Sequence, residues 1–309
     1  VYMDGHLVDT GRNTVSQDWS DMGLYMGAYK DGGSMDSFAD GIIDNFIVWN
    51  RTLSSGEIHA TYGNEKIAKQ WSYTTGDLAY TVSVSADGEY IAAGSYDDKV
   101  YLFDKDSSTP LWSYDTDYDV LTVDISADGE YIVAGTSGYA VYLFDKGSST
   151  PLWSYTDASG SAHVVSISAD GEYIVSCSGD YDKKVRLFHK DSSTPLWTYT
   201  TDGGFTSGRS CDMSADGEYI AVGNTEDDDR LYLFDKDSST PLWYYSASDN
   251  VYSVSISKDG EYIVAGTVDH KIHFFDKDSN TPLWTYTTGY QMQGVSISAD
   301  GKYIAGGGL

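Results

Sequence analysis

The sequence predicts an all-β protein whose larger part is a β-propeller of four-stranded blades, and three observations support this. The motif Asp-Gly-(Glu/Lys)-Tyr occurs six times, its aspartates separated by 41, 42, 46, 43 and 41 residues. Six of the eight tryptophans fall at one position of the repeat, and all five prolines open a Pro-Leu-Trp. Between 71 and 309 no sustained helical periodicity is found. A unit of this length with four short strands is typical of a propeller blade, which buries its faces only against neighbouring blades.

The first complete repeat divides into four expected strands, over 80–85, 90–94, 100–103 and 111–114. The first strand alternates, with Val82 and Val84 on one face, which is the pattern of a half-buried strand. Asp87 and Gly88 then favour a turn, because Gly accepts positive φ and Asp bonds nearby backbone. Pro110 stands at the entrance of the fourth strand, where a missing N–H costs least. Turn residues thus separate every pair of strands.

The repeats predict five complete blades and one partial blade. The sixth repeat supplies Trp284 and two strands, over 294–298 and 303–307, but no third strand. Residues 70–73 could serve as a donated outer strand, since Trp71-Ser72-Tyr73 has the sequence of a fourth strand. The sequence begins within a strand pattern and stops within a repeat, so we expect it to be a fragment of a propeller with seven or eight blades.

The repeat resembles two families of propellers. The run from Ser85 to Asp104 resembles a WD40 repeat, although Phe-Asp replaces the Trp-Asp ending and the opening Gly-His is missing. The run from Val100 to Tyr114, VYLFDKDSSTPLWSY, is equally similar to the Trp-motif of quinoprotein-like (PQQ-type) propellers. The resemblance covers residues 71–309 and implies a propeller fold in either case. A ligand does not follow from it, because fold does not fix function.

Residues 1–62 carry no copy of the repeat and form a different domain. Strands are expected over 1–3, 24–28 and 41–49, followed by a short helix that Ser54 and Glu57 would cap. The segments VYMDG and GIIDNFIVWNRTLS resemble the C-terminal end of laminin-G-like, concanavalin A-like jelly-roll domains. This resemblance implies the last third of such a domain, joined by a linker at 63–70 to the propeller. It also implies that Asp44 lies where some relatives place a calcium-associated carboxylate. The alternative for Asp44 is structural hydrogen bonding.

Several acidic and sulfur-containing residues are candidate sites. Four aspartates follow the third strand of a repeat, where Asp is favoured as a turn cap and calcium binding is the alternative; they are Asp104, Asp145, Asp235 and Asp276. A second acidic run, Asp227-Asp228-Asp229, is expected as a solvated hairpin insertion, with calcium or a basic partner as alternatives. Cys177 and Cys211 are expected as two buried free thiols or as a disulfide between neighbouring blades.

Histidines and catalytic motifs point away from an enzyme. The six histidines lack the spacing of a metal site, and His270 and His273 fall on opposite faces of one strand region by parity. Nucleophile elbows, phosphate-binding loops and dinucleotide motifs are also missing from the sequence. Near-copies of the same residues recur in every unit, whereas catalysis needs different residues gathered in one place. We therefore predict that the chain is not an enzyme, and no cofactor is predicted apart from calcium in the jelly-roll part.

Charge and domain order favour a binding function. The net charge of −28 disfavours nucleic acid and anionic lipid, and no apolar run approaches the roughly 18 residues needed to span a membrane. We predict a non-catalytic binding, adhesion or scaffold module of a larger surface or secreted protein, with a protein or glycan partner. The sequon Asn50-Arg51-Thr52 and the jelly-roll resemblance favour an extracellular location. The alternatives are an intracellular (cytoplasmic) WD40-like scaffold and a quinone- or metal-dependent oxidoreductase.

Overall fold

The chain forms two compact units, Val1–Ser72 and Tyr73–Leu309. The computed structural model describes residues 2–3, 6–7, 71–156, 162–179, 182–203, 205, 210–225 and 229–308. In the N-terminal unit, β1 (Tyr2–Met3) pairs antiparallel with β2 (His6–Leu7), and β1 falls within the strand expected over 1–3. The other elements predicted for 1–62 and the linker at 63–70 lie outside the described residues. The domain boundaries and the jelly-roll interpretation therefore stay predictions.

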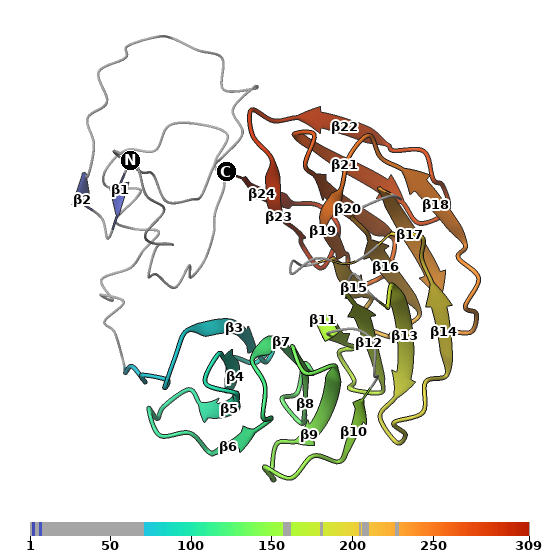
Figure 1. Cartoon of the computed structure of the whole chain (residues 1–309). Coiled ribbons are helices and arrows are strands. Elements are labelled where there is room, and N and C mark those ends of the chain that lie inside the picture. Colours follow the sequence, from blue (N-terminus) through green and yellow to red (C-terminus); the bar gives the residue numbers. More distant parts are fainter. Residues whose placement is uncertain are drawn as a thin grey trace. The chain divides into compact units, whose positions relative to one another are not determined.

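The C-terminal unit consists of five four-stranded antiparallel sheets and one two-stranded sheet, so the predicted propeller architecture is confirmed (Figure 1). Blades 1 and 2 comprise β3 (Ala79–Val84), β4 (Tyr90–Ser95), β5 (Lys99–Asp104), β6 (Trp112–Asp115), β7 (Val120–Ile125), β8 (Tyr131–Thr136), β9 (Ala140–Asp145) and β10 (Trp153–Thr156). Blades 3 and 4 comprise β11 (Ala162–Ile167), β12 (Tyr173–Ser178), β13 (Lys184–His189), β14 (Trp197–Thr200), β15 (Cys211–Met213), β16 (Tyr219–Gly223), β17 (Arg230–Asp235) and β18 (Trp243–Ser246). Blade 5 and the half-blade comprise β19 (Val251–Ile256), β20 (Tyr262–Thr267), β21 (Lys271–Asp276), β22 (Trp284–Thr287), β23 (Met292–Ile297) and β24 (Ile304–Gly308).

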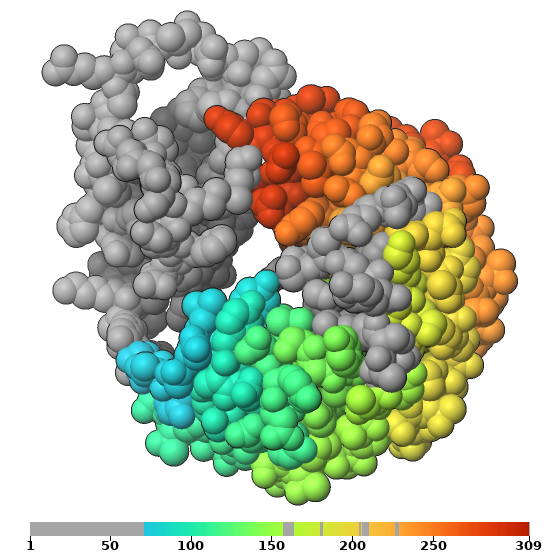
Figure 2. Space-filling model, viewed as in Figure 1, coloured from blue at the N-terminus to red at the C-terminus, as the bar shows by residue number. Residues whose placement is uncertain are grey.

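Successive blades contact each other through their first strands. The strand β7 lies against β3 and β11, and β19 lies against β15 and β23. In the space-filling view, the blades of the C-terminal unit follow one another in chain order, coloured from cyan through green and yellow to red (Figure 2). Within a blade, the four strands follow chain order outward from this first strand, so that β6, β10, β14, β18 and β22 form the outer edges.

Burial of the first strand depends on the preceding blade. Val123 and Ile125 in blade 2 are only 6% and 7% exposed, because blade 1 covers them. The equivalent residues of blade 1, Val82 and Val84, are 60% and 53% exposed. The same sequence pattern is therefore core in one blade and surface in another, as expected when each blade shelters its neighbour.

The repeated Ser-Ala-Asp-Gly-Glu-Tyr segment forms a closed turn between the first and second strands. Ser126 Oγ donates to Asp128 Oδ1 at 2.7 Å and accepts the Tyr131 N–H at 3.0 Å. Gly129 takes φ +72°, a conformation that favours glycine. The turn also joins blades, because the Ala127 N–H donates to the Ala169 carbonyl of the next turn at 2.9 Å. Equivalent bonds link consecutive turns from Ala86 to Ala299.

The repeated tryptophan fills the space between blades, as predicted. Trp153 stacks on Phe188 of the next blade with ring centroids 5.5 Å apart, and its Nε1–H donates to the Lys190 carbonyl at 2.7 Å. Tyr155 packs edge-on against the same phenylalanine at 5.2 Å. The Trp of each Pro-Leu-Trp in blades 1 to 4 makes this bond, and they are Trp112, Trp153, Trp197 and Trp243.

The predicted outer strand at 70–73 is found only in part. Residues 71–73 form no strand in the structure. Tyr73 nevertheless packs against Tyr101 and Phe103 of blade 1, with ring centroids 5.4 and 5.2 Å apart. Tyr155 of blade 2 makes the equivalent edge-on contact with blade 3 at 5.2 Å. Tyr73 therefore occupies the place of a fourth-strand tyrosine without the strand pairing.

We expect Trp153→Phe to destabilise the chain by about 1 kcal/mol more than Trp284→Phe, the matched control. The first substitution removes the indole bond to the Lys190 carbonyl between blades. Trp284 is exposed, and among the described residues its indole N–H has no acceptor. Urea unfolding followed by circular dichroism measures both variants. Equal losses would show that the interblade bond contributes nothing net.

Candidate interaction surface

The aspartates that follow the third strand cap turns, which confirms the structural interpretation of these residues. Asp104 Oδ1 accepts the Asp106 N–H at 2.9 Å, and Asp145 Oδ1 accepts the Gly147 N–H at 2.8 Å. Asp235 and Asp276 cap in the same way, at 2.8 and 2.9 Å. In the part of the chain that the structure describes, no three His, Cys, Asp or Glu side chains are grouped closely enough to hold a metal ion.

Two predicted sites fall partly or wholly outside the described residues. Asp44, predicted as a calcium ligand, lies outside the described residues, and so do Asp227 and Asp228 of the acidic run. Asp229 immediately precedes β17, and its carbonyl accepts the Ala247 N–H at 2.7 Å. The acidic run thus belongs to the connection between β16 and β17, the hairpin to which the sequence assigned it.

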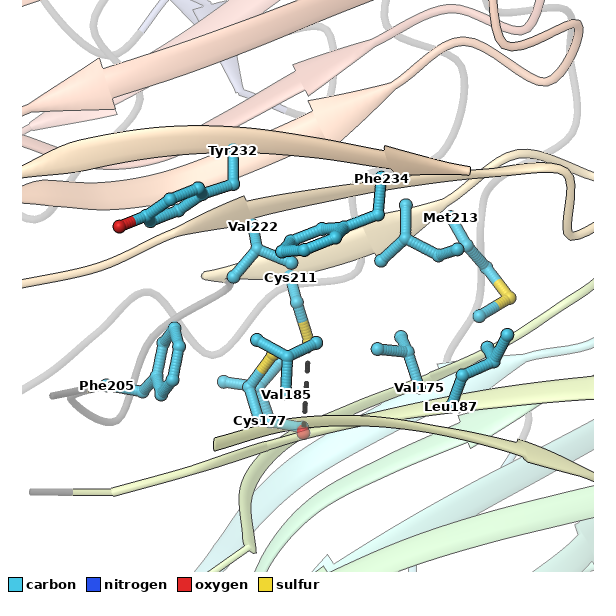
Figure 3. Close-up of a cluster of buried hydrophobic side chains, with 12 residues drawn as sticks. Val175, Cys177, Val185, Leu187, Phe205, Cys211, Met213, Val222, Tyr232 and Phe234 are labelled. Atoms are coloured by element: carbon cyan, nitrogen blue, oxygen red, sulfur yellow. Dashed lines mark hydrogen bonds between the residues drawn. The ribbon is translucent and has the colours of Figure 1, made fainter. Parts of the chain in front are cut away.

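The two cysteines are buried and free, and they lie in one apolar cluster between blades 3 and 4 (Figure 3). Cys211 Sγ lies 3.9 Å from the Val164 carbonyl oxygen. Burial and the neighbouring Cys177 raise the pKa of the Cys211 thiol well above its usual value. A thiol that stays protonated is a poor nucleophile, so Cys211 acts as a core side chain. Cys177 is buried in the same apolar cluster.

His270 and His273 lie in different surroundings, as their parity predicted. His270 is exposed on the turn before β21, whereas His273 is buried in that strand. The Nδ1 of His273 lies 3.0 Å from Thr285 Oγ1, and burial lowers the pKa of the imidazole. The two side chains therefore do not share a site.

Sequence reasoning missed two interior carboxylates, Asp124 and Asp212. Asp124 lies in the first strand of blade 2 and accepts hydrogen bonds from both neighbouring blades. Its Oδ1 accepts from Ser83 Oγ at 2.9 Å, and its Oδ2 accepts from Ser166 Oγ at 3.2 Å and from the Ile167 N–H at 3.0 Å. These bonds hold the carboxylate in place, so Asp124 joins blades rather than facing a ligand.

Asp212 plays the same role in blade 4. Its Oδ2 accepts from Ser255 Oγ at 3.1 Å and from the Ile256 N–H at 3.0 Å, both in blade 5. The Asp212 side chain is half-buried, and it lies on β15, the innermost strand of blade 4, where the protein surrounds it. The resulting desolvation, together with repulsion from Asp124, raises the pKa of Asp212 to about 6.

The surface that stands out for binding is the outer rim, defined here as the Leu of each Pro-Leu-Trp together with the edge strand that follows. Each leucine N–H bonds back to the third strand of its blade, as Leu111 does to the Leu102 carbonyl at 2.8 Å. The side chains are left 51 to 54% exposed in all five blades, and they are Leu111, Leu152, Leu196, Leu242 and Leu283. Among the described residues each edge strand pairs with a neighbour on one side only, which leaves outer backbone groups for a partner strand. The Tyr244 carbonyl of β18 is an exception, because it accepts from Asn280 Nδ2 at 3.2 Å.

Lys105 and Lys236 beside the rim are each paired with two carboxylates, so the surroundings of the rim keep a net negative charge. Lys236 lies 2.9 Å from Asp237 and 3.3 Å from Glu218. Lys105 pairs with Asp106 at 2.8 Å and with Glu89 at 3.1 Å. A partner at the rim therefore meets apolar side chains and backbone hydrogen-bonding groups, beside an excess of carboxylates. This arrangement suits an extended peptide, which binds by adding a strand to a sheet edge.

Comparison with known proteins supports the quinoprotein-like interpretation of the repeat. The model of the family described as outer membrane protein assembly factor BamB, a PQQ-like repeat family, matches residues 47–179 and 181–308. The match begins within the segment assigned above to a jelly roll, and it gives no support to a laminin-G-like domain there. No curated protein matches the chain. The described residues form no helix of the length and hydropathy that crossing a membrane requires. With most of its length matched, the chain belongs to the BamB family of PQQ-like repeat proteins.

Proposed function

We propose that this chain is a non-catalytic binding module of a larger surface or secreted protein, and that its rim recognises an extended segment of a protein partner. The observation that carries the proposal is the rim itself. Five blades present a half-exposed leucine at the same position, next to an edge strand with open backbone groups. A strand laid along such an edge gains main-chain hydrogen bonds and an apolar contact.

The family description supports a protein ligand over a glycan. It names a factor in the assembly of outer membrane proteins, which is a task that involves other polypeptides. The same description supports a location outside the cytoplasm, at the cell surface or beyond. The repetition of equivalent residues in every blade supports binding over catalysis, because a reaction centre requires unlike groups at one place.

The proposal is tested by measuring binding of the chain to immobilised peptides and to a glycan array. We expect retention on peptides of about eight residues that alternate apolar and polar side chains, a length typical of strands. The triple variant Leu111→Ser/Leu152→Ser/Leu196→Ser is expected to weaken three of the five rim sites about tenfold, since each loses its apolar contact, and to leave the sites of Leu242 and Leu283 unchanged.

The matched control replaces three exposed tyrosines away from the rim, in Tyr118→Ser/Tyr139→Ser/Tyr290→Ser. This variant should bind peptides as the unaltered chain does. Retention on glycans without peptide binding would overturn the proposal. Peptide binding that the rim variant leaves unchanged would also contradict it, because the site would then lie elsewhere on the chain.

A further inference from the structure

We propose that Cys177 and Cys211 form an oxidation site, at which a disulfide joins blades 3 and 4 and stabilises the fold. Cys177 lies in β12, the second strand of blade 3, and Cys211 lies in β15, the first strand of blade 4. Both are buried in the apolar cluster between these blades. Figure 3 shows the two side chains pointing toward one another, and the two thiols are within hydrogen-bonding reach. The reduced pair is therefore already placed for a bond between the blades.

Neighbouring interfaces show that these two positions of the repeat face each other. A Cβ added to Gly223 of blade 4 would lie 3.0 Å from Cγ1 of Val254 in blade 5, and one added to Gly266 would lie 2.9 Å from Cγ1 of Val295. Cβ atoms joined through a disulfide lie about 3.5–4.5 Å apart, and Cγ1 is one bond beyond the valine Cβ. Two cysteines at these positions are thus within reach of a disulfide.

The sequence places cysteine at both positions of one interface and at neither position of any other. The residues equivalent to Cys177 in the other five repeats are all glycine, and they are Gly94, Gly135, Gly223, Gly266 and Gly307. The residues equivalent to Cys211 are all valine, and they are Val82, Val123, Val165, Val254 and Val295. The two departures from the repeat thus meet at a single interface, as expected of a pair that acts together.

The first strand on this side of the interface is the shortest one. The strand β15 has three residues, whereas β11 of blade 3 and β19 of blade 5 have six each. Less backbone pairing therefore holds the innermost strand of blade 4 in its sheet. A covalent bond from Cys211 to blade 3 would anchor this short strand, and it would also close a long loop in the unfolded chain and so restrict it.

The chemistry requires an oxidant of the disulfide class, such as oxidised glutathione. One protein thiolate attacks the glutathione disulfide, which forms a mixed disulfide and releases one glutathione thiol. The second protein thiolate then displaces the other glutathione. The protein pair loses two electrons and two protons in total, one S–S bond forms, and the glutathione disulfide is reduced to two thiols.

Burial decides when this reaction occurs. In the folded chain the Cys211 thiol is 4% exposed, and burial together with Cys177 raises its pKa, so little thiolate is present and a dissolved oxidant reaches it poorly. In the unfolding chain both thiols are exposed and titrate normally. The disulfide therefore forms while the chain folds, and the finished fold protects whichever state it has closed around.

The test is to refold the full chain with oxidised glutathione or with an excess of reductant. Free thiols counted with Ellman's reagent in denaturant should fall from two per chain to none after oxidative refolding. Trypsin cleaves after Lys190, between the two cysteines, so a digest of the oxidised chain should contain a linked pair of peptides. The oxidised chain should melt about 10 °C above the reduced one, because the cross-link restricts the unfolded state.

The matched controls are Cys177→Gly and Cys211→Val, which restore the residues of the other repeats. Each should melt at the same temperature after either refolding, and the comparison of the two states of the unaltered chain stands even if a control folds poorly. The proposal would be overturned by two thiols that survive oxidative refolding, by a disulfide between two chains on a non-reducing gel, or by a cross-link that leaves the melting temperature unchanged. No rim residue takes part, so such a result leaves the proposed function untouched.

Discussion

Gly171→Ala is expected to lower the free energy of unfolding by about 3 kcal/mol. Gly171 sits at the turn of blade 3 with φ +74°, and an L-residue in this region costs roughly 1–2 kcal/mol. A methyl group there would also lie 2.4 Å from Cδ2 of Tyr131 in the preceding blade. The tyrosine ring has little room to move, because Lys190 lies over it at 5.1 Å. Overpacking of this kind adds about 1–3 kcal/mol.

Gly88→Ala separates the two contributions. Gly88 has nearly the same φ, +73°, but no described residue lies within 4 Å of the added methyl group, because the described residues form no blade before this turn. We therefore expect a loss of about 1 kcal/mol, from the backbone conformation alone. Urea unfolding monitored by tryptophan fluorescence compares the two variants. If both glycines proved equally tolerant, the packing of one turn on the preceding blade would not contribute to stability.

The difference between these two glycines also shows what can be predicted from the sequence. The repeat identified the strands, the turns and the tryptophan that fills each interface, because these features follow from local residue preferences repeated at a fixed spacing. Gly88 and Gly171 stand in the same motif, so the sequence assigns them the same role. Their different surroundings depend on which blade has a neighbour, and that is a property of the assembled fold.

The interior carboxylates were missed for a related reason. Alternation within a strand distinguishes its two faces, but it does not show that the innermost strand of one blade touches those of the next. Asp124 and Asp212 obtain their hydrogen bonds from residues about one repeat away, such as Ser166 and Ser255. A signal was nevertheless present, since the other four repeats have Ser at this position. The rim leucines were likewise visible within Pro-Leu-Trp, but their exposure depends on the edge position of the strand.

Asp212 is expected to make stability depend on pH, and Asp212→Asn should remove that dependence. Burial raises the pKa of the folded carboxyl to about 6, while an unfolded aspartate titrates near the usual value of about 3.9. Below pH 4 the Asp212 carboxyl holds its proton in both the folded and the unfolded state, so the protonated side chain makes its full contribution to the stability of the fold. As the pH rises towards 6, the unfolded state releases its proton first, so the folded state loses stability, and above pH 6 the loss is complete.

The measurable quantity is the difference in unfolding free energy between Asp212→Asn and the unaltered chain. This difference should rise by about 2 kcal/mol in favour of the variant between pH 4 and pH 7.5, since one pKa unit corresponds to about 1.4 kcal/mol and residual water screens part of the shift. Other titrating groups are common to both proteins and cancel in the comparison. Asp124→Asn should move the window to lower pH, because removing that charge relieves the repulsion on Asp212. A difference that stayed constant with pH would mean that the carboxyl is solvated, and that the blades do not close around it as the structure shows.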